Sequence, residues 1–228
     1  MIDTVLLDLD DTILDFHKAE AIAVRQALTE MGVDVTDAIV ARYSELNAQQ
    51  WRLLEAGEIT RAQVLTRRFE LLYAELGLTR SGEETQQRYE CLLSQGHYFL
   101  PGAEELLETL SQRYALYLVS NGNAVVQEGR LKSANIGRYF QDMFISEHIG
   151  ADKPQKLFFD RCFQRMPGFR RETAIIVGDS PTSDIRWGIN AGIRTCWFNP
   201  HHKPPHPDIP ADYEIDALSK LPPLLAQI

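Results

Sequence analysis

The chain has few cysteines, no long apolar run and no excess of basic residues. Its 228 residues include 3 cysteines, 23 lysines and arginines, and 32 aspartates and glutamates, for a formal net charge of −9. A protein that binds the backbone of nucleic acid needs a basic surface to neutralise the phosphates, so this balance argues against nucleic acid as a partner. Cys91, Cys162 and Cys196 are far apart and form no C-x-x-C pair, which is typical of buried thiols in a reducing compartment. No segment resembles a secretory signal or a transmembrane span, and we therefore expect a cytoplasmic protein without membrane contact.

The first strand signal of the chain is followed at once by acidic residues. The apolar residues 5–7 precede Asp8 and Asp10, and Thr12 follows two positions later. A run this short, stopped by polar residues, predicts a buried strand rather than a helix. In open α/β sheets the ligand crevice lies beyond the carboxyl ends of the strands, so carboxylates at this place are useful as chemistry. A strand followed by an ordinary polar turn explains this segment equally well when it is taken alone.

Residues 17–96 have a different texture, rich in Glu, Gln, Ala, Arg and Leu. Apolar residues recur at helical spacing over 19–27, and further helices are expected over residues 37–54, 61–76 and 82–94. Gly57, Gly77 and Gly82 separate these helices, while Thr60 and Ser81 are suitable N-caps. We predict a separate all-helical unit here.

From residue 101 onward, helix and strand patterns alternate. The expected helices are residues 103–112, 124–134, 156–165, 182–191 and 218–226, and the expected strands are residues 114–119, 143–145, 174–177 and 195–198. Alternation of this kind predicts a doubly wound parallel sheet in an α/β fold, to which the first strand also belongs. The chain is therefore expected to form a core from residues 1–16 and 97–228, with an all-α insertion at 17–96.

Polar side chains follow four of the expected strands, on one edge of the sheet. Besides Asp8 and Asp10, these residues are Ser120, Asn121, Lys153, Asp179 and Asp184. Each has an ordinary explanation as a turn, cap or surface residue. These explanations do not account for the occurrence of all these residues together on one edge, because clustered aspartates repel one another and any phosphate. A divalent cation with oxygen ligands, naturally Mg²⁺, resolves this repulsion. Lys153 then adds a positive charge for phosphate oxygens, and Ser120 can donate a hydrogen bond to them.

These segments, in this order and spacing, resemble the four motifs of the haloacid dehalogenase-like superfamily of phosphotransferases. The first segment has the form D-x-D-x-T, the third is a Lys-Pro pair, and the fourth has the form G-D-x-x-x-x-D. The resemblance implies a Rossmann-like core, and it implies that residues 17–96 are a C1-type helical cap with hinges near residues 15–17 and 94–98. Motion of such a cap excludes water from the leaving group.

The resemblance also implies a role for each residue. Asp8 is expected to be the nucleophile that forms an aspartyl-phosphate, and Asp10 the general acid and base. Asp8, the backbone carbonyl of Asp10, and Asp179 are expected to hold Mg²⁺. Asp184 supports the metal ligands, and Thr12 stabilises the loop that positions Asp10. Ser120, Asn121 and Lys153 are expected to bind phosphate.

A narrower resemblance concerns the substrate. Trp51, the segment 57–60 and Arg67-Arg68-Phe69 in the insertion are similar to a bacterial pyrimidine 5′-nucleotidase group. Gln127-x-x-Arg130-Leu131 and Cys196-Trp197-x-Asn199-x-His201-His202 are similar to that group as well. We expect Trp51 and Phe69 to pack in the core and Arg67 and Arg68 to lie on a solvated helix face. The implied partner is a small phosphorylated metabolite, a nucleoside monophosphate.

Several alternatives stay open at this point. A sugar-phosphate phosphatase or a phosphoglucomutase-like phosphotransferase would use the same Asp8 and Asp10, and a catalytically inactive relative would serve as a binding scaffold. A dehalogenase would lack Asp10, and a receiver-type signalling domain would be about half as long and would have no cap. The sequence allows both a monomer and a homodimer.

Overall fold

The computed structural model describes all residues from 1 to 228, which form two compact units. The larger unit consists of Met1–Phe16 and His97–Ile228, and the smaller unit is His17–Gly96. The smaller unit is thus an insertion after the first strand of the larger one. None of the helices combines the length and the hydropathy that crossing a membrane requires.

The larger unit is built on one sheet of 6 parallel strands, in the order β3-β2-β1-β4-β5-β6. The strands are β1 (Thr4–Leu7), β2 (Ala115–Ser120), β3 (Asp142–Ile145), β4 (Ala174–Gly178), β5 (Arg194–Phe198) and β6 (Tyr213–Ile215). The predicted doubly wound α/β fold is confirmed. Because all the strands run the same way, their carboxyl ends meet at one edge, with β1 central between β2 and β4.

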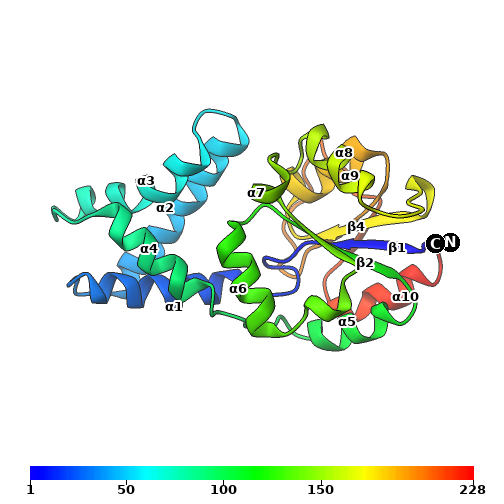
Figure 1. Ribbon diagram of the computed structural model, residues 1–228, viewed down its shortest axis with the longest axis horizontal. Helices are drawn as coiled ribbons and strands as arrows, with labels where there is room; N and C mark the ends of the chain where they lie inside the picture. The colour runs from blue at the N-terminus through cyan, green and yellow to red at the C-terminus, as the bar shows by residue number, and fades with distance from the viewer. The chain divides into compact units, whose positions relative to one another are not determined.

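Helices cover both faces of this sheet (Figure 1). They are α5 (Ala103–Ser111), α6 (Ala124–Ala134), α7 (Ser146–Ile149), α8 (Lys156–Gln164), α9 (Arg186–Ala191) and α10 (Leu221–Leu225). Short turns are η1 (Gly137–Tyr139), η2 (Arg171–Thr173), η3 (Pro181–Ile185) and η4 (Leu218–Lys220). Val5 and Leu7 of β1 pack in one core with α5 and α10, whereas Leu6 packs in a second core with α8 and α9. The strand alternation therefore makes β1 apolar on both faces, as a central parallel strand requires.

Several short elements differ from the sequence-based expectation, among them the helix expected over 218–226, which begins as η4 and becomes α10 at Leu221. The helix expected over 182–191 begins as the π-helical turn η3 and becomes α9 only at Arg186. The sequence pattern also missed α7 and β6, which have 4 and 3 residues. Segments this short contain too few residues to show a period.

The smaller unit contains four helices whose positions agree with the sequence pattern. They are α1 (Phe16–Glu30), α2 (Asp37–Glu55), α3 (Arg61–Glu75) and α4 (Gly82–Leu93). Thr60 and Ser81 cap α3 and α4 as predicted, because their hydroxyls accept the N–H groups of Gln63 and Glu84. Gln63 also accepts the N–H of Thr60 through its side chain, which completes a capping box.

The interior of the smaller unit is more polar than expected. Phe69 lies in the core as predicted, but the placement of Arg68 on a solvated face is wrong, because Arg68 is 3% exposed. Its guanidinium donates to Asn47 and Gln86, both at 2.6 Å, and lies 4.9 Å from the ring centre of Tyr89. The expectation of a solvated face rested on the charge of Arg68 alone, and the sequence pattern does not reveal its hydrogen-bond partners on α2 and α4.

Candidate active site

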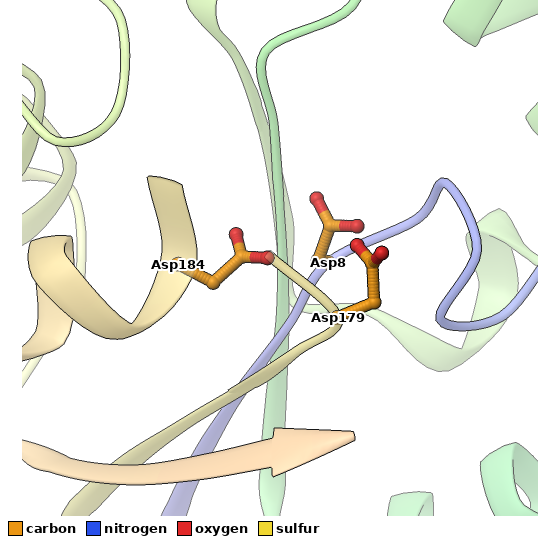
Figure 2. A group of neighbouring side chains, drawn as sticks. All are labelled: Asp8, Asp179 and Asp184. Carbon is orange, nitrogen blue, oxygen red and sulfur yellow. The ribbon is translucent and has the colours of Figure 1, made fainter. Parts of the chain in front are cut away.

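Three carboxylates meet at the carboxyl edge of the sheet. Asp8 follows β1, Asp179 follows β4, and Asp184 lies in η3 (Figure 2). β1 and β4 are neighbours, with Leu7 opposite Val177, so the residues that follow them emerge side by side. Carboxylate oxygens of the three residues all lie within 4.8 Å of one another.

Lys153 supplies the positive charge in this cluster. Its ammonium donates to Asp8 and Asp184, each at 2.7 Å, and to the carbonyl of Val119 at 2.8 Å. Lys153 is 1% exposed, so three acceptors replace its lost hydration. A lysine buried in this way links the ends of β1, β2 and η3.

The charges of the cluster do not balance. Burial, together with the neighbouring Asp184 and Asp10, raises the pKa of Asp8 to about 8 even though Lys153 opposes the change. Burial and the carboxylates of Asp184 and Asp8 also raise the pKa of Asp179 well above its usual range. Burial alone would lower the pKa of Lys153, but Asp184 and Asp8 outweigh it and raise that pKa. One ammonium faces three carboxylates, so the cluster either retains a proton or gains from a bound cation.

Short-range contacts fix the two strand ends relative to each other. Thr12 donates through its hydroxyl to Asp8 at 3.3 Å and accepts the backbone N–H of Asp179 at 3.1 Å. The indole N–H of Trp197 donates to the carbonyl of Asp179 at 2.8 Å. Thr12 therefore joins Asp8 to Asp179 directly, which is a closer role than the loop support expected for it.

Asp184 approaches the backbone closely because residue 178 is a glycine. A Cβ atom at Gly178 would collide with the carboxylate of Asp184. The other oxygen of that carboxylate accepts the N–H of Ser180 at 3.1 Å, while Lys153 occupies the first. Asp184 is thus held from both sides and orients Lys153 toward Asp8.

Ser120 and Asn121 follow β2 at the same edge. The Asn121 side chain donates to the Lys153 carbonyl at 2.8 Å and to Ser183 at 3.2 Å, and it accepts the Lys153 N–H at 2.7 Å. This amide fixes the backbone that carries Lys153. A phosphate contact by Asn121 stays a prediction.

The Asp10 side chain is directed toward helix α6 rather than toward the three carboxylates. It accepts hydrogen bonds from Gln127 and Arg130, to which the sequence analysis gave no role in the site. The chain turns directly after Asp10, because Asp11 adopts a left-handed conformation with φ of 55° and accepts the Phe16 N–H at 2.9 Å. The sequence signal for Gln127 and Arg130 was their spacing, because two polar residues three positions apart share one face of the helix predicted over 124–134.

The donor set fits a hard divalent cation. The side chains that converge offer only oxygen atoms, as Mg²⁺ prefers, and their combined charge is negative. Lys153 contacts Asp8 and Asp184 and offers a single positive charge to three carboxylates. A cation there would remove the imbalance.

Comparisons with known proteins agree with this geometry. Residues 2–192 match the profile of the haloacid dehalogenase-like hydrolases. The Bacillus subtilis protein named HAD-hydrolase YfnB is 41% identical over 96% of this chain and 93% of its own length. Its crystal structure, described as bound to magnesium and as revealing interdomain movement, superposes with a TM-score of 0.95 over 98% of both chains.

Two further relatives carry names that specify a reaction. Pyrimidine 5′-nucleotidase PynA of Streptococcus pneumoniae is 39% identical over 92% of this chain and 90% of its own. Pyrimidine 5′-nucleotidase YjjG of Escherichia coli is 28% identical over 99% and 98%. The profile match spans most of the chain and the similarity to YfnB nearly all of it, and both cover the acidic edge of the sheet. The chain therefore belongs to the haloacid dehalogenase-like hydrolase family.

Proposed function

We propose that this protein is a Mg²⁺-dependent phosphomonoester hydrolase that acts through an aspartyl-phosphate and prefers pyrimidine nucleoside 5′-monophosphates. The observation that carries the reaction is the buried array of Asp8, Lys153 and Asp184, with Asp10 two residues after Asp8 at the edge of the sheet. The names of the two nucleotidase relatives support the substrate class. The presence of Asp10 argues against dehalogenation.

Asp8 is the proposed nucleophile. One of its carboxylate oxygens attacks phosphorus, the bond from phosphorus to the leaving oxygen breaks, and the phosphoryl group becomes attached to Asp8. Thr12 and Lys153 hold the carboxylate in one orientation before the attack. Lys153 and the hydroxyl of Ser120 stabilise the negative charge on the phosphoryl oxygens.

Asp10 is the proposed proton carrier. It gives a proton to the leaving oxygen in the first half of the reaction and thereby becomes a carboxylate. In the second half this carboxylate accepts a proton from water as the water attacks phosphorus and the bond to Asp8 breaks. Asp10 ends protonated, Asp8 is free, and inorganic phosphate leaves.

Mg²⁺ would be held by the side chains of Asp8 and Asp179 and by the backbone carbonyl of Asp10. When bound, it supplies positive charge that lets an anionic nucleophile approach an anionic phosphate. Asp184 acts through its contacts with Lys153 and the N–H of Ser180, which keep the neighbouring ligands in place.

The helical insertion is the proposed cap. Its four helices form a compact unit of their own that joins the larger unit at residues 16–17 and 96–97. The interdomain movement described for YfnB supports a role in closing the site around the leaving group and excluding water.

The experiment is phosphate release from a panel of pyrimidine and purine nucleoside 5′-monophosphates and sugar phosphates, with Mg²⁺ and with EDTA. Preferential turnover of pyrimidine nucleotides that requires Mg²⁺ is the expected result, and Asp8→Asn, which keeps the shape but removes the nucleophile, is expected to be inactive. A preference for sugar phosphates would support the proposed reaction and contradict the proposed nucleotide substrate. Transfer of phosphate to a second sugar would indicate a mutase, and no release from any substrate would leave a binding scaffold.

A further inference from the structure

The carboxylate of Asp10 is held by two residues of α6 that lie three positions apart. Gln127 donates through its side-chain N–H to one carboxylate oxygen at 2.6 Å, and Arg130 donates to the other oxygen. Arg130 also donates to the side-chain carbonyl of Gln127 at 3.1 Å. Both oxygens of Asp10 therefore have a donor, and the two donors are joined to each other, which fixes the plane of the carboxylate.

Gln127 and Arg130 are buried although both side chains are polar. Arg130 is 0% exposed and Gln127 is 1% exposed, whereas the Asp10 side chain is 29% exposed. Burying a guanidinium is costly unless an acidic group and hydrogen bonds compensate, and the carboxyl group of Asp10 lies against it. The buried Arg130 therefore holds the partly exposed carboxyl group of Asp10 in a defined orientation.

Gln127 connects Asp10 to the proposed phosphate-binding hydroxyl. The same N–H₂ group donates to Ser120 Oγ at 2.8 Å, and the N–H of Gly122 donates to that oxygen at 3.1 Å. Because Ser120 Oγ accepts two bonds, its own hydrogen is directed to a different acceptor, as binding to a phosphoryl oxygen requires. A side chain at residue 122 would collide with Gln127, so Gly122 permits this contact.

We propose that Gln127 and Arg130 are positioning residues for Asp10, an inference that rests on the proposed function. They hold the carboxylate so that its exposed side faces the leaving oxygen in the first half of the reaction and the attacking water in the second. Each Asp10 oxygen uses one lone pair on its donor and keeps another for the proton it transfers. Proton transfer depends steeply on orientation. Loss of the hydrogen bonds from Gln127 and Arg130 to Asp10 should therefore slow the proton-dependent step without removing the nucleophile.

Two substrates with different leaving groups test this inference. A nucleoside monophosphate releases a basic alkoxide oxygen that needs a proton, whereas 4-nitrophenyl phosphate releases a phenolate that needs almost none. The measurement is the rate of the first turnover by rapid quench, since this rate reports leaving-group departure before water attacks. For Gln127→Leu and Arg130→Met we expect a decrease of about 100-fold with the nucleotide and of less than about threefold with 4-nitrophenyl phosphate.

Matched controls come from the same helix. Lys132→Met removes an exposed positive charge from α6, as Arg130→Met removes a buried one, and Glu128→Gln changes the exposed residue next to Gln127; both should leave the two rates unchanged. Arg130→Lys keeps the charge but lacks the planar fork, and its nucleotide rate should lie between those of wild type and Arg130→Met. Thermal melts of all variants show whether they fold.

The result separates the inference from the proposed function. Equal losses with both substrates, or no loss with the nucleotide, in a folded variant of an active enzyme would overturn the positioning role alone. If Arg130→Met fails to fold, Gln127→Leu, which removes no charge, decides the question in the same way. A wild-type enzyme that hydrolyses no alkyl phosphate would overturn the proposed function and this inference together.

Discussion

The ammonium of Lys153 lies 2.7 Å from a carboxylate oxygen of Asp8, and both groups are buried at the end of the central strand. A second carboxylate, that of Asp184, lies at the same distance from the ammonium. Asp8 therefore depends on Lys153 for charge, and Lys153 depends on Asp184 for position. This dependence makes the stability of the fold sensitive to the residues proposed for catalysis.

Removing Lys153 should destabilise the protein strongly. Lys153→Met leaves the buried carboxylate of Asp184, and that of Asp8 where it is ionised, without a cation, which costs about 3–5 kcal/mol in comparable buried pairs. Denaturant unfolding in EDTA measures this loss, and added Mg²⁺ should recover part of it. Lys156→Met, which removes an exposed lysine from α8, should change stability by less than about 0.5 kcal/mol. Equal effects of the two substitutions would contradict the interpretation.

Without a divalent cation, stability should fall as the pH rises. The folded pKa of Asp8 is about 8, above the usual 3.8, so between these values the fold retains a proton that the unfolded chain has lost. This contribution is complete below the unfolded pKa and disappears as the pH rises through the folded one. Asp8→Asn is neutral at every pH and should gain stability relative to wild type between about pH 5 and about pH 9 in EDTA.

Thermal melts in EDTA at several pH values test this sign. The exposed Asp208 provides the control, since Asp208→Asn should follow the wild-type pH dependence. A wild-type protein that becomes more stable relative to Asp8→Asn as the pH rises would contradict the predicted direction.

Mg²⁺ should stabilise the wild-type protein, and the effect should depend on Asp179. A ligand that binds only the folded state adds about 2.7 kcal/mol at 100 times its Kd, which is visible as a rise in melting temperature. Asp179→Asn should lose most of this rise. Asp10→Ala should keep it while losing nucleotide turnover, because the proposed metal ligand at this position is the backbone carbonyl and not the side chain. Loss of the rise in Asp10→Ala would place the Asp10 carboxylate itself on the metal.

A methyl group at residue 178 should damage the site. The added Cβ would collide with the Asp184 carboxylate, so Gly178→Ala must displace Asp184 and with it Lys153. We expect a destabilisation of about 1–3 kcal/mol and a loss of phosphatase activity. Gly137→Ala, where the nearest atom lies at 3.9 Å, should be neutral in both measurements.

The buried arginine of the smaller unit should control the local stability of that unit. Arg68→Met leaves the acceptor oxygens of Asn47 and Gln86 without their donor, at a cost of about 1–3 kcal/mol for each group. Hydrogen exchange should accelerate in α2, α3 and α4 and stay unchanged in the sheet. The neighbouring Arg67 is exposed, and Arg67→Met should leave exchange unaltered.

The sequence was sufficient for five of the six strands, all but β6, and for the polar residues at the carboxyl edge of the sheet. Strands such as β1 and β4 are short apolar runs stopped by polar residues, and in a parallel sheet such runs place Asp8 and Asp179 on the same side. Local patterns, handedness and strand direction carry this information, and they required no knowledge of side-chain contacts.

Contacts between distant segments were not predictable in the same way. The orientation of Asp10 toward Arg130 depends on the turn at Asp11 and on the rotation of α6, and neither leaves a periodic trace. The Asn121 side chain accepts the backbone N–H of Lys153 at 2.7 Å, and this contact joins two loops that no sequence pattern places together. Arg68 illustrates the same limit, since its charge indicated solvent while its partners lie on two other helices.

The insertion after β1 has a consequence for how the chain folds. Thr4 must pair with Ala115, which follows the entire inserted unit in the sequence. Bringing two segments that are so far apart in the chain together costs chain entropy. The N–H of Asp15 donates to the carbonyl of Tyr98 at 2.7 Å, so the two ends of the insertion lie next to each other in the native protein. Once the helices of the insertion have formed, a loop of some 80 residues behaves as a short tether, and β1 meets β2 as though they were close in sequence.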